Sequence, residues 1–569
     1  MGSDLINGKK LIIAHQTRMP RNLVKIATNE GFIRCPETRN PDNQHPKETR
    51  IMITPPSHRA SNLCHAPEDM AAADSFGDLP EWNLADLYAA EDAPELTRDL
   101  AQVTRDCTEF AADYAGKMDQ LDAAGLLSAI ERYEAIQTIG GRIMSFAGLR
   151  YYQNTLDPER AKFMSDMQSA ITEATGALVF FSLEINRIDD DALTAMLTQS
   201  PELNRYAPVL RRLRAMRPHQ LSDELEQFLH DQSVVGASAW NKLFDETMAG
   251  LIFTVDGEEM SLEATLNLMS DPDRARREAG AKALISVFAD NLPLFARITN
   301  TLAKEKQIED KWRNMPTPQT GRHLANDVEP EVVEALRNAV VDAYPRLSHR
   351  YYALKAKWLG LERLEIWDRN APLPDRDEAS IQWQDARRIV TDAYADFHPK
   401  MAELATPFFE NGWIDAAVKP GKAPGAFAHP TVTSVHPYVM LNYLGKQRDV
   451  MTLAHELGHG VHQRLAAGQG EMLSSTPLTL AETASVFGET VTNNRLLDMI
   501  DDPGERFALL ASVVDDSVAT VFRQVAMNRF ESACHSERRD VGEISVDGEL
   551  LGRMSPAELS LPGGSYQVT

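Results

Sequence analysis

Three residues in the C-terminal third of the chain have the types and spacing of a hydrolytic metal site. His455, Glu456 and His459 form the pattern His-Glu-x-x-His. In a helix, a spacing of four residues places two side chains on one face, about one turn apart. Two imidazoles on one face can bind a zinc ion, and the intervening carboxylate can reach a water molecule bound to that ion. The pattern therefore indicates metal-assisted hydrolysis, most often of a peptide bond.

A zinc site of this kind needs a third protein ligand and one position open to water. The sequence offers Glu482, which follows His459 at a distance that allows one helix to end and a second to return. Glu482, Ser485 and Glu489 share one face of that second helix. Thr479 and Glu482 also fit a capping box, so a purely structural interpretation of Glu482 is open. Glu489 is either a carboxylate that orients a ligand histidine or an ordinary solvated or interhelical charge.

The segment 449–465 must form the helix that carries both histidines. Its apolar residues recur at helical spacing and predict one buried stripe, formed by Val450, Leu453, Ala454, Leu457, Val461 and Leu465. We expect Asp449 to cap the N-terminus of this helix. Gly458 and Gly460 weaken the helix by up to about 1 kcal/mol each. Glycine at these positions indicates the close approach of another backbone, or room for a bound ligand.

Composition excludes several classes of partner. The 569 residues carry a formal net charge of −25, which argues against nucleic acid or an anionic membrane as the main partner. No apolar run approaches the roughly 18 residues of a membrane span. The four cysteines are far apart, so we expect neither a disulfide framework nor a thiolate metal site, and we expect a cytoplasmic protein.

Most of the chain has the pattern of amphipathic helices. Helical segments are predicted at residues 124–133, 139–152, 158–183, 222–231 and 271–289. Ser222 and Asp271 stand at plausible starts of the last two. One exception is the segment 251–260, where alternation around Asp256-Gly257 predicts a β-hairpin. The first 60 residues carry ten Lys or Arg against five Asp or Glu, and we expect residues 1–75 to be a disordered leader.

Several separated motifs resemble those of the oligoendopeptidase F family, which are zinc metallopeptidases related to thimet oligopeptidase. The segments that carry the resemblance are, in chain order, 321–326, 367–373, 434–443, 448–463 and 480–489. The resemblance extends over roughly residues 79–542. It implies a mainly α, multi-helical body of the zincin type, with a deep channel for short peptides and a small β element before the metal-binding helix.

The resemblance also implies a role for each residue of the motif. His455, His459 and Glu482 become the ligands of one zinc ion per chain. Glu456 becomes the general base. Glu489 keeps both interpretations given above.

The segment 435–443 would be an edge strand beside the channel, where an extended peptide could pair with it through main-chain hydrogen bonds. His436, Tyr438 and Tyr443 are therefore candidate substrate contacts, although an ordinary buried strand is an equally good interpretation. His462 is a further histidine close to the motif. A lone histidine near a site more often packs or accepts a hydrogen bond than takes part in catalysis.

The chain departs from the family near its C-terminus. Family members continue with an aromatic-rich stretch whose His and Tyr contact substrate, whereas here the resemblance fades after residue 543. We expect an N-terminal helical domain at 76–200 and a catalytic domain at 201–569. The leading function is a zinc-dependent endopeptidase of short oligopeptides. A helical zinc carboxypeptidase, and an inactive zinc-holding protein that binds peptides, stay open as alternatives.

Overall fold

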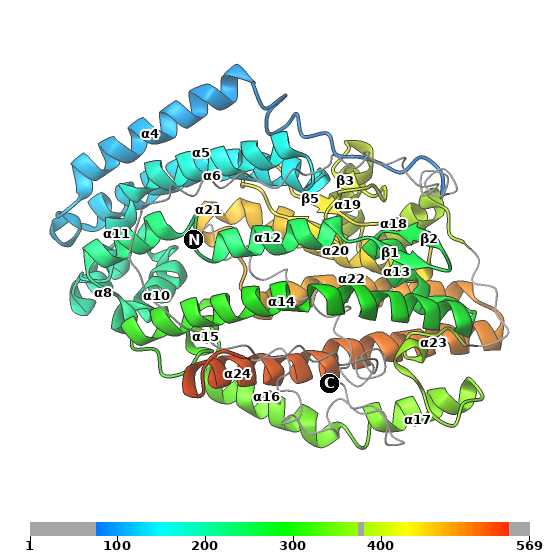
Figure 1. Ribbon diagram of the computed structural model, residues 1–569. Coiled ribbons are helices and arrows are strands. Elements are labelled where there is room, and N and C mark those ends of the chain that lie inside the picture. Colours follow the sequence, from blue (N-terminus) through cyan, green and yellow to red (C-terminus); the bar gives the residue numbers. More distant parts are fainter. Residues whose placement is uncertain (1–75, 374–379, 545–569) are drawn as a thin grey trace, which may run out of the picture.

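The computed structural model describes residues 76–373 and 380–544. The predicted leader, residues 1–75, lies outside the described residues, as does the C-terminal tail from residue 545. Figure 1 shows long helices lying side by side, with α4 and α5 at one end of the molecule and α16, α17 and α24 at the other. Five short strands accompany them in the part of the chain that the structure describes. The predicted mainly α fold is confirmed.

The first group of helices precedes the hairpin. Its members are α4 (Pro94–Tyr114), α5 (Ala123–Gln153), α6 (Pro158–Gly176), α7 (Val179–Ile185), α8 (Asp190–Gln199), α9 (Pro201–Asn204), α10 (Ala207–Ala215), α11 (Asp223–Gln232) and α12 (Ala237–Gly250). Two predicted segments merge into α5, because the residues between them contain no helix breaker. The predicted segment 158–183 instead divides into α6 and α7 after Gly176, the residue with which α6 ends. Ser222 is the N-cap residue of α11, as expected.

The predicted β-hairpin is confirmed. Strands β1 (Phe253–Val255) and β2 (Glu258–Met260) pair antiparallel. Between them, Asp256 and Gly257 have φ angles of 53° and 90°. Two consecutive left-handed residues are what a tight type I′ turn requires, and Asp-Gly is among the pairs that tolerate it best.

A second group of helices follows the hairpin. It comprises α13 (Leu262–Asn267), α14 (Arg274–Trp312), α15 (Thr320–Ala325), α16 (Pro330–Ala343), α17 (Ser348–Trp358), α18 (Trp383–Phe397) and α19 (Pro399–Glu410). The predicted start of α14 at Asp271 is wrong, because Asp273 caps the helix through a hydrogen bond from the Ala275 backbone N–H. Asp271 instead accepts from the Asp273 N–H in the preceding turn. The helix also runs far past residue 289, with Pro293 inside it.

A small sheet leads into the helices of the motif. It contains β3 (Ile414–Asp415), β4 (Phe427–His429) and β5 (Tyr438–Met440) in the order β3-β5-β4. The pairing of β5 is parallel with β3 and antiparallel with β4. The chain then continues through α20 (Gln447–Ala466), α21 (Glu471–Ser474), α22 (Leu478–Met499), α23 (Pro503–Val518) and α24 (Gln524–Asp540).

One large hydrophobic cluster joins the early helices to this later part. It includes Phe110 and Phe146 from α4 and α5, and also Tyr438 of β5 and Leu457 of α20. The expected division into domains at residue 200 stays a prediction, and the cluster draws residues from both sides of it. None of the helices in the described ranges combines the length and apolar character that a membrane span would need.

Candidate metal centre

Helices α20 and α22 are the two helices expected from the motif, and glycines let them cross closely. A Cβ atom added at Gly458 would lie 2.6 Å from the Ala484 carbonyl oxygen. A Cβ atom added at Gly488 would lie 2.6 Å from the Ala454 carbonyl oxygen on the facing helix. Both separations are shorter than a real Cβ atom tolerates, so a larger residue at either position would push the helices apart. The predicted approach of another backbone at Gly458 is confirmed.

Three details of α20 differ from the expectation. The helix begins two residues before Asp449, so Asp449 lies within its first turn, where its carboxylate accepts the Lys446 N–H at 3.1 Å; the predicted N-cap at Asp449 is wrong. Leu465 is 56% exposed, because it lies in the last turn, while the other five residues of the predicted stripe are buried. At Gly460 the close neighbour is the Phe408 ring rather than a backbone.

The capping-box interpretation of Glu482 is wrong. Helix α22 begins at Leu478, so Thr479 lies inside its first turn instead of before it. The Thr479 hydroxyl donates to the Asn326 carbonyl oxygen at 2.9 Å. The Asn326 side-chain oxygen accepts the Leu478 N–H at 3.2 Å. The helix start is therefore held by a distant loop, which leaves the Glu482 carboxylate available for other contacts.

The structure brings the three predicted ligands together. Glu482 Oε2 lies 3.2 Å from His455 Nε2 and 3.5 Å from His459 Nε2. One ligand atom from each residue lies within 4.8 Å of the other two. Zinc binds nitrogen and oxygen at about 2.0–2.2 Å, so two ligand atoms of a tetrahedral site lie about 3.3 Å apart. Both the types of the donor atoms and their spacing fit one such ion.

Two more side chains fix the orientation of this cluster. Glu489 Oε1 lies 2.5 Å from His455 Nδ1, on the side of the ring opposite to Glu482. The Ser485 hydroxyl donates to Glu482 Oε2 at 2.8 Å. The predicted shared face of Glu482, Ser485 and Glu489 is confirmed, and Glu489 occupies the place of a carboxylate that orients a ligand histidine.

The cluster is electrostatically coupled. Burial alone would lower the pKa of His455, but hydrogen bonds to Glu482 and Glu489 outweigh it and raise that pKa to about 10. Burial alone would raise the pKa of Glu482, but hydrogen bonds from His455 and His459 hold it well below its ordinary range. The hydrogen bond between His455 and Glu482 thus stabilises the charged form of each side chain. A cation that binds there replaces the imidazole proton as the positive partner of Glu482.

Glu456 and His462 occupy different positions on α20. Glu456 is 6% exposed, and its charge is among the influences that raise the pKa of His455. His462 is half-buried, and burial together with the charge of His459 lowers its pKa. The cluster of three possible metal ligands in the described residues does not include His462.

The three candidate substrate contacts lie in or close to β5, and burial contradicts two of them. The rings of Tyr438 and Tyr443 are at most 1% exposed. Their hydroxyls donate to the backbone carbonyls of Asn83 and Ile381 at 2.8 and 2.9 Å. The expected edge strand is wrong as well, because β5 lies between β3 and β4 and both its sides are paired.

His436 lies just before β5 and is held from two sides. Its ring stacks on Trp413 with centroids 3.6 Å apart. Its Nε2 atom lies 2.9 Å from Asp86 Oδ2. These contacts account for His436 as a packing residue, and its substrate contact stays a prediction.

One residue that packs against the crossing of α20 and α22 could not be identified from the sequence pattern. Tyr394 of α18 is fully buried, and its hydroxyl donates to the Ala454 carbonyl oxygen at 2.6 Å. The same hydroxyl would clash with a Cβ atom added at Gly488. Tyr394 therefore packs at the point where α18, α20 and α22 meet. Only the spatial arrangement of helices far apart in the chain could reveal this role.

One helix carries His-Glu-x-x-His and the helix that faces it carries a glutamate. This arrangement is typical of metallopeptidases. Comparison with known proteins agrees with this class. The model of Peptidase family M3 matches residues 267–548, and the model of Oligopeptidase F matches residues 184–253. The chain belongs to peptidase family M3, within the oligoendopeptidase F group, and is a metalloendopeptidase that hydrolyses oligopeptides.

Relatives and solved structures support the same assignment. Group B oligopeptidase PepB of Streptococcus agalactiae is 25% identical over 463 residues, which are 80% of this chain and 76% of the relative. Oligopeptidase PepF of Bacillus subtilis is 23% identical over 81% of this chain and 69% of its own length. The crystal structure of oligoendopeptidase-F from Enterococcus faecium has the same fold, with a TM-score of 0.57 and 22% identity over 80% of this chain and 77% of that one. These matches favour neither the carboxypeptidase nor the inactive binding protein.

Proposed function

We propose that His455, His459 and Glu482 bind one zinc ion and that this site cleaves internal bonds of short peptides. The observation that carries the proposal is the convergence of two imidazole nitrogens on one carboxylate oxygen, at 3.2 and 3.5 Å. Donors of this kind and number are typical of catalytic zinc sites, which keep a fourth position open.

A bound zinc ion supplies Lewis acidity, since it polarises a carbonyl oxygen and lowers the pKa of a coordinated water molecule toward about 7. Glu456 then has the role of general base and acid. Its carboxylate receives the proton of the attacking water and passes it to the nitrogen of the departing amine. Its position on α20, between the two histidines, supports this assignment.

Glu489 and Ser485 position the ligands in this proposal. Glu489 accepts the Nδ1 proton of His455, which fixes the neutral tautomer whose Nε2 lone pair faces the cluster. Ser485 donates to Glu482 Oε2 and limits the rotation of that carboxylate. Both side chains act through a ligand.

We also propose that the protein works in the cytoplasm. Cys107 and Cys534 are buried, form no disulfide, and lie on helices distant in the chain. Cysteines that keep their thiols fit a reducing compartment.

The test combines metal content with turnover. Glu456→Gln should keep about one zinc per chain and lose roughly 10²–10⁴-fold in kcat, because general acid–base catalysis contributes about that much. His455→Ala should lose the metal, whereas the matched control His462→Ala should keep both metal and activity. Wild-type turnover in Glu456→Gln, or full zinc content in His455→Ala, would overturn the assignment.

Peptides with blocked ends separate the two kinds of peptidase. An endopeptidase cleaves a short peptide whose C-terminus is amidated, and mass spectrometry then shows an internal cut. Cleavage that is lost on amidation would favour the carboxypeptidase. Zinc retained without cleavage of any peptide in a mixed pool would favour the inactive binding protein.

A further inference from the structure

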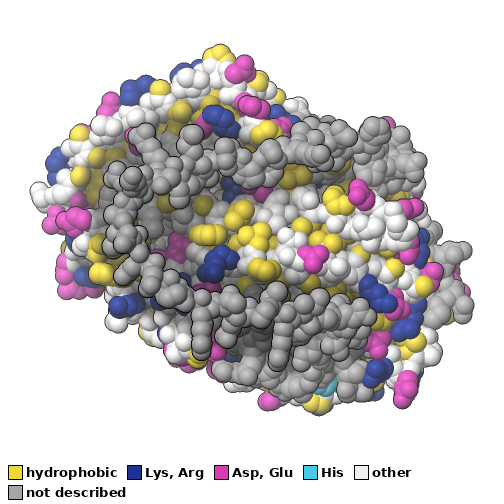
Figure 2. All heavy atoms as spheres, viewed as in Figure 1, with side chains coloured by type: hydrophobic (Ala, Val, Ile, Leu, Met, Phe, Trp, Pro, Cys, Tyr) yellow, Lys and Arg dark blue, Asp and Glu magenta, His cyan; other side chains and the backbone are white. Residues whose placement is uncertain are grey.

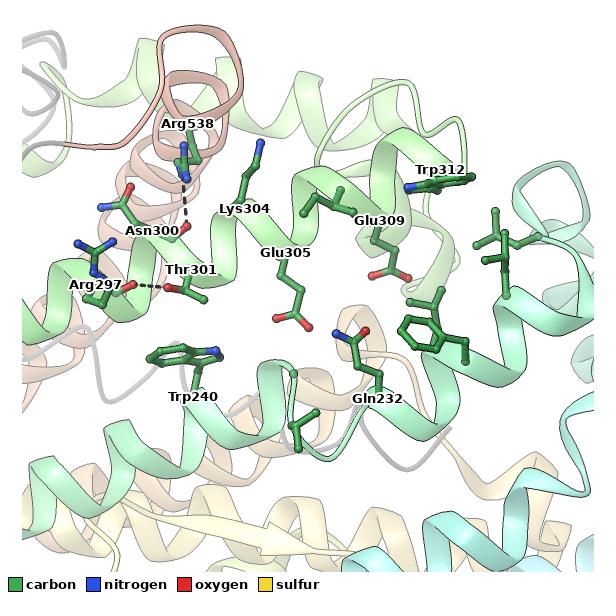
Figure 3. A pocket seen from close by; sticks show the side chains of 17 residues that line it. Gln232, Trp240, Arg297, Asn300, Thr301, Lys304, Glu305, Glu309, Trp312 and Arg538 are labelled. Carbon is green, nitrogen blue, oxygen red and sulfur yellow. Dashed lines mark hydrogen bonds between the residues drawn. The ribbon is translucent and has the colours of Figure 1, made fainter. Parts of the chain in front are cut away.

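A groove whose lining includes none of the metal-cluster residues lies between α11 and α12 on one side and α14 and α24 on the other. Its volume is about 600 Å³. Figure 3 shows α14 along one wall, with Trp240 of α12 facing Arg297 and Thr301. Figure 2 shows hydrophobic side chains gathered on this face of the molecule, over α12 and α14.

Several large apolar side chains in this groove are exposed together. Phe228 is 59% exposed, Ile308 50% and Trp312 61%, and all three line the same cavity. Large apolar groups gathered in one hollow usually mark an interaction site, because exposing them to water is unfavourable. The lining is therefore suited to a segment with bulky apolar side chains.

Basic side chains line the same groove. Arg297 and Lys304 come from α14, and Arg538 comes from α24. The two acidic groups of the lining have other contacts: Glu305 accepts the Ala237 N–H at 3.1 Å, and Glu309 lies 2.7 Å from Arg313. Arg297 pairs with Glu543, and Arg538 donates to the Asn300 carbonyl oxygen. Lys304 is therefore the basic group that an acidic side chain of an occupant would complement.

The described chain ends at the rim of the groove. After α24, Ile544 exchanges two hydrogen bonds with the Asn300 side chain, at 2.7 and 2.9 Å. Glu543 pairs with Arg297 at 2.9 Å. Asn300 and Arg297 both line the groove, so the described chain ends at its edge.

The next residues have the length and chemistry that the groove requires. Residues 545–551 read Ser-Val-Asp-Gly-Glu-Leu-Leu, with two acidic residues before a pair of leucines. From Asn300 to Trp312, α14 rises about 18 Å at 1.5 Å per residue. Six residues of extended chain span about 20 Å. Leu550 and Leu551 can therefore reach the Phe228–Trp312 end from Ile544.

We propose that residues 545–551 lie along this groove, with Leu550 and Leu551 against Phe228 and Trp312 and with Glu549 beside Lys304. The segment covers the exposed apolar lining. It also ties α11 and α12 to α14, so that the end of the chain holds two groups of helices together. This docking is independent of the metal cluster and of the peptidase activity.

Hydroxyl-radical footprinting of the full-length chain, read residue by residue by mass spectrometry, tests the proposal. The side chains of Phe228 and Trp312 should be labelled several-fold more slowly in the wild type than in the variant Leu550→Asp/Leu551→Asp. The matched control Leu559→Asp/Leu561→Asp alters two leucines outside the proposed segment 545–551 and should keep the protection. Unchanged labelling of the distant, exposed Phe507 shows that the fold is intact.

A charge exchange adds an independent readout. Lys304→Glu should speed the labelling of Trp312, and adding Glu549→Lys to it should restore slow labelling. Equal labelling of the wild type and the Leu550→Asp/Leu551→Asp variant overturns the proposal. Protection that disappears on dilution also overturns it, because the occupant would then be a second copy of the chain.

Discussion

The crossing of α20 and α22 and the β3-β5-β4 sheet before it both place polar side chains close together, but they do so in opposite ways. At the crossing, the side chains of His455 and His459, which are 19% and 15% exposed, meet Glu482, whose side chain is 50% exposed. In the sheet, Lys422 and Asp415 form an ion pair of 2.6 Å with both side chains at most 4% exposed. The difference teaches that a site for a ligand keeps polar groups facing one another with one of them open to solvent, whereas a structural ion pair is enclosed on all sides.

In the ion pair of the sheet, the Lys422 ammonium has several acceptors besides the Asp415 carboxylate. Besides Asp415, the Lys422 ammonium donates to the backbone carbonyls of Ala417 and Leu441, each at 2.8 Å. These contacts tie the loop before β4 to β3 and to the residue after β5. The ammonium thus has no donor left for a substrate, and its role is to hold the sheet on which α20 packs.

The largest change in stability is expected from breaking this pair. Lys422→Met leaves the Asp415 carboxylate buried without its cation, which costs roughly 3–5 kcal/mol in comparable sites. Urea denaturation measures the loss. The matched control Lys419→Met removes an exposed pair with Glu81 and should cost at most about 1 kcal/mol. Equal effects of the two variants would contradict the distinction between the regions.

At the crossing of α20 and α22, the close approach of the two helices is the property most sensitive to substitution. Gly458→Ala places a methyl group 2.6 Å from the Ala484 carbonyl oxygen, and overpacking of this kind costs roughly 1–3 kcal/mol. Because the displaced helix carries Glu482, we expect zinc content to fall as well. Gly468→Ala is the matched control, since a Cβ atom added there meets nothing within 4 Å. A Gly458→Ala protein with wild-type stability and zinc content would refute the close crossing.

A smaller effect is expected where a side chain acts through a ligand. Glu489→Gln keeps the shape of the side chain but weakens its hold on His455 Nδ1, and losses of this kind lower metal affinity by about 10–100-fold. Competition with a chelator measures the affinity. Glu505→Gln, an exposed residue of α23, should leave it unchanged. If both variants bind zinc equally well, Glu489 is only an interhelical charge.

The comparison also separates what the sequence could predict from what it could not. The i, i+4 spacing of His455 and His459 and the common face of Glu482 and Glu489 are local properties of helices, and both predictions are confirmed. Gly458 was informative because a glycine inside a helix needs a reason, and here the reason is the Ala484 backbone.

The wrong predictions concern partners that are distant in the chain. Tyr438 and Tyr443 have the same residue type as a substrate contact, and only the strand order and the enclosing core show that they pack. The start of α22 at Leu478 depends on Asn326, which lies more than a hundred residues earlier. Tyr394 could not be found for the same reason. Spacing along one helix predicts a shared face, but it says nothing about what lies opposite that face.

The smallest expected effect is a pH dependence at the boundary of the sheet. Burial raises the pKa of Glu263 on α13, although a hydrogen bond from the Gly425 N–H opposes this. Above the ordinary pKa of glutamate, the folded protein therefore holds a proton at this site that the unfolded chain has released. By linkage, this site makes the folded state less stable as the pH rises through that interval.

Glu263→Gln removes this titration and keeps a side-chain oxygen that can accept from Gly425. We expect the difference in unfolding free energy, variant minus wild type, to become more positive from about pH 4 to pH 7, the interval above the ordinary glutamate pKa. Urea denaturation at several pH values measures that difference, with Glu258→Gln on the exposed face of β2 as control. A flat difference would mean that the Glu263 carboxylate is as well solvated as an exposed one. The sheet boundary would then resemble the accessible crossing, and the contrast between enclosed and accessible polar groups would hold only for the Lys422 pair.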